Sequence, residues 1–179
     1  LQNGTLKGTA PMETSLNTLS LFAEILMAFV AFSAIVASLR VSFGTALTDF
    51  QKLLVQFFTV TGMLGVSVFL LPLVIAEFSD SEKTVAQYSI IYTLVCNSVY
   101  LVVYLRQRFG IGSPTPLVSA LVMIGYFTWL PVLLLTAVGL IFEATLGILV
   151  AYGFWVLVSS PTIFVLFLYE FIHPGATDS

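Results

Sequence analysis

Long apolar runs, separated by short polar segments, dominate this chain of 179 residues. A bilayer core about 30 Å thick is crossed by about 20 apolar helical residues, and the scarce charged residues divide the chain into five runs of about that length. A membrane β-barrel would instead show short segments of alternating polarity. The pattern therefore predicts an all-α integral membrane bundle of five transmembrane helices, at residues 16–39, 53–76, 84–105, 116–141 and 145–171.

The segments outside these runs suggest a simple organisation. We expect one transmembrane domain at residues 12–173 and a C-terminal tail at 174–179. Residues 1–11 are expected to be a leader foreign to the native chain or a disordered tail, because Met12 can serve as a start residue. The fourth and fifth runs are joined only by a short turn around Glu143, so we expect them to pair as antiparallel neighbours.

Two short motifs in the chain concern helix ends and helix packing. Ser79-x-x-Glu82 matches the capping-box pattern, in which a serine oxygen accepts from a free N–H at a helix start. Thr61-x-x-x-Gly65 and Gly147-x-x-x-Ala151 each place two small residues one turn apart. Such pairs let two membrane helices approach closely, so we interpret both as packing seams.

Composition supports a membrane location. Hydrophobic residues make up 59% of the chain and charged residues 8%, with a mean hydropathy of +1.06. A soluble domain has about 25% charged residues because its surface faces water. Charge is too scarce here to cover a globule, so we predict an integral protein of a membrane, specifically a bacterial inner (plasma) membrane.

The few basic residues predict the orientation of the spans. The first connecting segment holds Arg40 and Lys52, and the third holds Arg106 and Arg108. The second holds only Lys83 among several acids, and the fourth has no basic residue. Because basic residues favour the cytoplasmic side, we predict the N-terminus outside and the C-terminus in the cytoplasm.

The residue inventory excludes several functional classes. One cysteine and one histidine leave no multi-cysteine or histidine-rich metal site. No basic run is present that could follow a phosphate backbone, so no nucleic-acid partner is expected. No HExxH, GxSxG or P-loop motif is present. We therefore predict no cofactor, no metal, no catalytic residue and no enzyme activity, and as partners membrane lipid, further copies of the chain or another membrane protein.

Glu24 is the first candidate functional residue, because a carboxylate within an apolar span costs about 3 kcal/mol to insert. Its helical face continues through Ala28, Ala31, Ile35 and Ser38. This small-residue stripe would let another helix approach, and in an oligomer it could line a pore with carboxylates that favour cations. Alternatively, Glu24 lies only about two turns into its helix and reaches the head groups or caps a neighbouring helix.

The third run carries an unusual polar patch in its middle. Tyrosines recur at intervals of four residues along this run, and the patch that falls at mid-membrane consists of Tyr92, Thr93, Cys96, Asn97 and Tyr100. Lipid offers these side chains no hydrogen bonds, so they must face protein or water. Hydrogen bonding between helices and a path for a solute are both compatible with this pattern.

The fifth run contains a candidate helix break at Ser159, Ser160 and Pro161. Proline removes one helical hydrogen bond and frees a carbonyl group one turn earlier. Neighbouring hydroxyls can satisfy the freed backbone and form a hinge or an ion site, although membrane helices also tolerate proline kinks that only shape the helix.

Together these features predict a small polytopic membrane protein that acts as a homo-oligomeric channel or transporter for a small ion or solute. In this interpretation Glu24 sets the charge preference, and the polar faces of the second and third runs line the path. The alternative is a non-transporting accessory or assembly subunit that binds another membrane protein or lipid.

Overall fold

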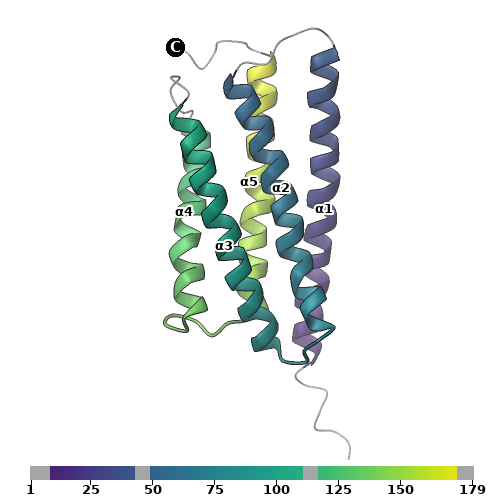
Figure 1. The fold of residues 1–179 in the computed structure, drawn as a ribbon. Helices are drawn as coiled ribbons and strands as arrows, with labels where there is room; N and C mark the ends of the chain where they lie inside the picture. The colour runs from purple at the N-terminus through teal and green to yellow at the C-terminus, as the bar shows by residue number, and fades with distance from the viewer. Residues whose placement is uncertain (1–8, 43–48, 111–116, 173–179) are drawn as a thin grey trace, which may run out of the picture.

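The computed structural model of this protein describes residues 9–42, 49–110 and 117–172, and these residues form a bundle of five helices (Figure 1). Each helix is long and apolar enough to cross a membrane, and the described residues contain no strand. The predicted fold class is therefore confirmed. The helices are α1 (Thr9–Ser42), α2 (Asp49–Ala76), α3 (Glu82–Phe109), α4 (Leu117–Ala137) and α5 (Leu146–Ile172).

The helix bounds agree with the predicted spans to within four residues, except at the start of α1. α4 ends at Ala137, four residues before the predicted end, and an irregular segment with Gly139 at a φ of 71° leads away from it. α1 begins at Thr9, seven residues before the predicted span, because polar residues of its first two turns remain helical while Met12 and Leu16 pack against the core. The predicted leader at residues 1–11 falls mostly outside the described residues and stays a prediction.

The helices run alternately up and down, so the two ends of the described chain lie at opposite ends of the bundle (Figure 1). α2 packs on α1, α3 and α5, and α3 and α5 both contact α4. α1 packs mainly on α2 and α5 and forms one edge of the bundle. Which end of the bundle faces the cytoplasm stays a prediction.

Close helix approach in the core depends on glycine at α2. Gly65 lies against Leu26 of α1, and a side chain at Gly62 would overlap Val30 of the same helix. Gly65 of the predicted Thr61-x-x-x-Gly65 pair therefore lies in a packing seam with α1, together with Gly62. Among the described residues of one chain, only the Thr145 hydroxyl would touch a Cβ added at Gly147, so the Gly147-x-x-x-Ala151 pair forms no seam within the bundle. A seam there with another chain stays a prediction.

The outer surface of the bundle is apolar. Val99 of α3, Ile124 of α4 and Val165 of α5 expose 60%, 59% and 63% of their area. Soluble monomers rarely expose contiguous apolar patches beyond a few hundred Å², whereas lipid is a favourable solvent for such a surface. The five helices thus indicate an integral membrane protein.

The start of α3 ties two helices together. Its N-cap is Ser81, whose hydroxyl accepts from Thr84 N at 3.4 Å, and Ser79 instead accepts from Ser81 N at 3.3 Å. The capping box predicted between Ser79 and Glu82 is therefore wrong, because the cap lies two residues later, at Ser81. The Glu82 carboxylate, freed from that role, accepts from Leu146 N at 3.4 Å and so caps the start of α5.

We expect Glu82→Ala to lower the stability of the bundle by about 1 kcal/mol, because it removes both an acceptor and a negative charge from the N-terminus of α5. Thermal unfolding in detergent measures the change. Glu77→Ala is the matched control, since Glu77 is exposed at the same end of the bundle and has no hydrogen bond or ion pair among the described residues. Equal melting temperatures for the two variants would contradict the capping role.

Candidate functional site

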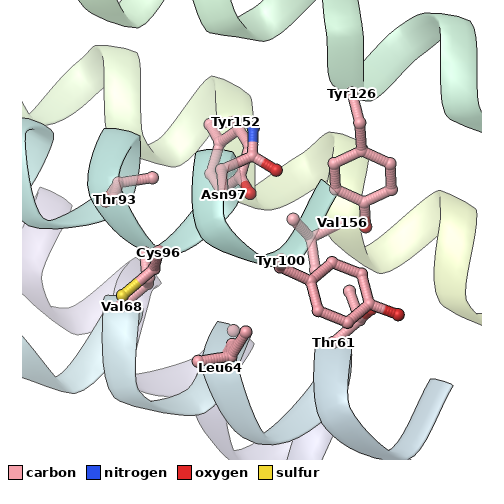
Figure 2. Close-up of a pocket in the computed structure, with 11 residues that line it drawn as sticks. Thr61, Leu64, Val68, Thr93, Cys96, Asn97, Tyr100, Tyr126, Tyr152 and Val156 are labelled. Atoms are coloured by element: carbon pink, nitrogen blue, oxygen red, sulfur yellow. The ribbon is translucent and has the colours of Figure 1, made fainter. Parts of the chain in front are cut away.

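The polar patch of α3 lies in the interior of the bundle, beside a small cavity between α2, α3, α4 and α5 (Figure 2). Four of the five predicted patch residues line this cavity, and Tyr92 does not. The lining residues are Thr61, Leu64, Gly65, Val68, Thr93, Cys96, Asn97, Tyr100, Tyr126, Tyr152 and Val156. The sequence therefore located the α3 wall of the cavity.

The cavity is too small to serve as a conduit. Its volume is about 20 Å³, whereas a single water molecule needs about 10–15 Å³ on this measure. An organic solute does not fit in this volume. A path for a solute would have to lie elsewhere.

Three of the patch residues are engaged in hydrogen bonds. The Tyr92 hydroxyl donates to Ser67 Oγ at 3.1 Å, and the Tyr100 hydroxyl donates to the Phe57 carbonyl at 3.4 Å, so both join α3 to α2. Thr93 Oγ1 donates within α3 to the Ser89 carbonyl at 2.7 Å. Tyr92 and Tyr100 therefore take part in hydrogen bonding between helices, which was one of the two alternatives for the patch.

Asn97 is the least satisfied residue of the patch. Its side chain is 5% exposed, and its Nδ2 has no hydrogen-bond partner among the described residues. Thr61 Oγ1 is also buried without a bond of good geometry, although Thr61 lies beside Tyr100 (Figure 2). A buried donor without a partner costs about 1–3 kcal/mol, and the cavity that both residues line is large enough for one water molecule.

The cavity also has walls that the sequence did not reveal. Tyr126 of α4 and Tyr152 of α5 are 3% and 6% exposed and line it opposite α3. Each is a single tyrosine whose neighbours three and four residues away are apolar or tryptophan. Hydroxyl residues do recur seven residues away, Ser119 before Tyr126 and Ser159 after Tyr152, and this spacing was the signal that could have marked both as parts of a polar face.

The predicted helix break in α5 is a continuous helix in the structure. α5 runs through Pro161 from Leu146 to Ile172. Ser159 Oγ donates to the Val156 carbonyl at 3.1 Å, so the Tyr126 hydroxyl, 2.9 Å from Ser159 Oγ, is the donor in that pair. Ser160 Oγ is buried and has no partner in the described part of the chain. Whether this segment bends in function stays a prediction.

Glu24 lies apart from the cavity, on the side of α1 that faces away from the bundle. Glu24, Ala28, Ala31, Ile35 and Ser38 are all exposed, so the whole predicted stripe faces outward. Among the described residues Glu24 forms no hydrogen bond or ion pair. Within the described part of one chain, therefore, no path combines Glu24 with the polar patch of α3.

The contacts of α1 give the height of Glu24 along the bundle. Phe22 packs edge-on against Phe69 of α2 with ring centroids 6.0 Å apart, and Leu26 lies against Gly65. Phe69 and Gly65 are seven and eleven residues before the end of α2 at Ala76, which is about 10 and 16 Å at 1.5 Å per residue. Glu24 falls between these levels, so it lies about 10 to 16 Å along the bundle from the end of α2. Whether its side chain reaches the head groups stays a prediction.

Candidate chemistry outside these two regions is sparse. No three His, Cys, Asp or Glu side chains of the described residues lie close enough to hold a metal ion. Comparison of the chain with protein-family models, with curated proteins and with solved structures finds no match to any of them.

Proposed function

We propose that this chain is a homo-oligomeric channel or transporter for a small cation, with a path formed between copies where their α1 helices meet. The observation that carries the proposal is Glu24, an outward-facing carboxylate within the span of α1 without a partner in the described chain. A carboxylate exposed to lipid within a span costs several kcal/mol. Contact with another protein surface or with water removes that cost.

A second copy fits this surface for two reasons. Of the five spans, α1 buries the smallest share of its most apolar segment inside the chain, 22% against 44% for α5. Its outward stripe is rich in alanine, which allows close helix approach. Because all copies enter a membrane in the same orientation, a symmetric contact through α1 brings each Glu24 to the same depth.

The chemistry of such a contact favours a cation. All six Lys and Arg residues lie outside the central parts of the spans, so a second copy offers Glu24 no basic partner there. Carboxylates that face one another cannot all stay ionised without a counter-charge. A shared proton or a bound cation supplies that charge, and rings of acidic side chains favour cations in channels.

A path between chains is favoured because the cavity at the polar patch, inside one chain, measures only about 20 Å³. In this proposal the polar patch of α3 fixes helix packing and does not contact the transported ion. Flux of Na⁺, K⁺ and H⁺ into liposomes containing the purified protein tests the proposal. Measurable cation flux supports it, and liposomes as tight as protein-free ones contradict it.

A second candidate is an accessory or assembly subunit that presents the α1 stripe to a different membrane protein. The small size of the interior cavity favours this alternative, because no solute path is needed for it. A partner of this kind would place a basic or hydrogen-bond-donating side chain beside Glu24. Absence of both flux and self-association would favour the accessory role.

A further inference from the structure

A groove opens on the outer surface between α4 and α5, at the end of the bundle where α4 ends and α5 begins. It has a volume of about 410 Å³, within the range of about 300–1,000 Å³ that is typical of ligand pockets. Its walls are mostly apolar, and one carboxylate stands at its rim. The lining residues are Trp129, Val132, Phe142, Glu143, Thr145, Gly147, Ile148 and Ala151.

The groove has a defined shape because small and large residues alternate around it. Gly147 and Ala151 form an exposed floor on α5, and an added Cβ at Gly147 would meet only the Thr145 hydroxyl, at 3.7 Å. Trp129 forms one wall, and its ring is held by an edge-on contact with Tyr152 at 5.6 Å. One side of the hollow is thus formed by a glycine and a fixed indole, and residues of the connection between α4 and α5 complete its mouth.

The groove extends from the water interface into the apolar zone. Trp129 lies eight residues before the end of α4, which is about 12 Å at 1.5 Å per residue. Glu143 belongs to the connection between the two helices and is exposed at the mouth. This arrangement fits a lipid molecule. The apolar part of the groove can hold an acyl chain, and the polar mouth can hold the head group.

Charge at the mouth selects among lipid head groups. Within the described residues, Glu143 has no ion pair, and this end of the bundle carries the carboxylates of Glu13, Glu77, Asp80 and Glu82 against the single ammonium of Lys83. An anionic head group is repelled there. A primary ammonium is attracted and, unlike a quaternary one, can donate charge-assisted hydrogen bonds to a carboxylate.

We propose that this groove is a binding site for a phospholipid with a primary-amine head group, with an acyl chain along Trp129 and Gly147 and the ammonium beside Glu143. The site is independent of the contact between copies through α1. It gives the α4–α5 face a preference for one lipid class within the surrounding bilayer.

Native mass spectrometry of the purified protein, with added phosphatidylethanolamine, phosphatidylcholine or phosphatidylglycerol of identical acyl chains, tests this proposal. We expect the wild-type chain to retain phosphatidylethanolamine about two- to fivefold more than the other two lipids, as one exposed ion pair allows. Glu143→Gln keeps the size of the side chain and should remove this preference. Gly147→Leu should remove it by filling the groove while the carboxylate stays in place.

A control variant and a second groove serve as comparisons for this experiment. Glu77→Gln removes another exposed carboxylate at the same end and should leave the preference unchanged. A second outer groove of about 560 Å³ has no charged residue among its described lining residues and should take all three lipids alike. These residues are Val118, Pro161, Thr162, Val165, Leu166 and Tyr169. Equal retention of the three lipids by the wild-type chain, or a preference that survives Glu143→Gln, would overturn the proposal.

Discussion

Gly125→Ala will lower the melting temperature of this bundle far more than the same methyl addition at Gly147. Gly125 of α4 faces Trp155 of α5, and a Cβ at this position would overlap the indole ring. Trp155 cannot move aside easily, because its ring also packs edge-on against the buried Tyr126 at 6.3 Å. Overpacking of this kind costs about 1–3 kcal/mol, and separation of α4 from α5 would cost more.

Thermal unfolding can be followed with a probe that the chain already contains, the thiol of Cys96. Cys96 is the only cysteine and is half-buried beside the interior cavity, so a thiol-reactive dye reports its exposure as the protein unfolds. Gly147→Ala is the matched control, because it adds the same methyl group to a helix in open space. If Gly125→Ala melts at the same temperature as Gly147→Ala, the described packing between α4 and α5 is wrong.

Glu24→Gln will reduce cation flux through liposomes at least tenfold, if Glu24 provides the charge that attracts the ion. Glutamine keeps the size and the hydrogen-bonding oxygen of the side chain but removes its negative charge. Loss of one charge-assisted interaction with an ion within the membrane is worth about 1.4 kcal/mol or more, which corresponds to this factor. Flux of Na⁺, K⁺ and H⁺ is compared at equal amounts of reconstituted protein.

Glu77→Gln is the control for that measurement, since Glu77 is a solvated carboxylate outside the spans. Its flux should equal that of the wild-type chain. Unchanged flux in Glu24→Gln would show that the carboxylate does not contact the path, even if the protein conducts ions. Such a result would separate the transport activity from the α1 stripe.

The number and type of the helices could be predicted from the sequence, because charge is so costly in lipid that its positions mark the ends of the spans. The height of Glu24 along the bundle could not be predicted from the sequence. The sequence placed the turns from Thr9 to Ser15 outside the first span, whereas they are helical in the structure. The contacts of Phe22 and Leu26 with α2 set the height of the carboxylate. Depth is a property of helix packing, and a single span carries no information on its neighbours.

Only the α3 side of the interior cavity could be predicted from the sequence, because the other sides depend on how the helices pack. Asn97 and Cys96 stand out within α3, because polar residues cluster there at helical spacing. Tyr126 and Tyr152 complete the cavity from two other helices, and only the tertiary arrangement reveals that they meet it. Likewise, the small-residue pattern at Gly147 was compatible with a packing seam and with an open groove, and within one chain the position of α4 decides between them.

Cysteine cross-linking within the membrane tests most directly whether copies meet through α1. In a Cys96→Ser background, Ala28→Cys places one thiol on the outward stripe, and Ala23→Cys, whose site is 2% exposed, places it toward the core of the same helix. A disulfide requires Cβ atoms about 3.5–4.5 Å apart. Contact between copies through α1 predicts a covalent dimer on oxidation for Ala28→Cys and only monomer for Ala23→Cys. Monomer for both variants, or equal dimer for both, would contradict it.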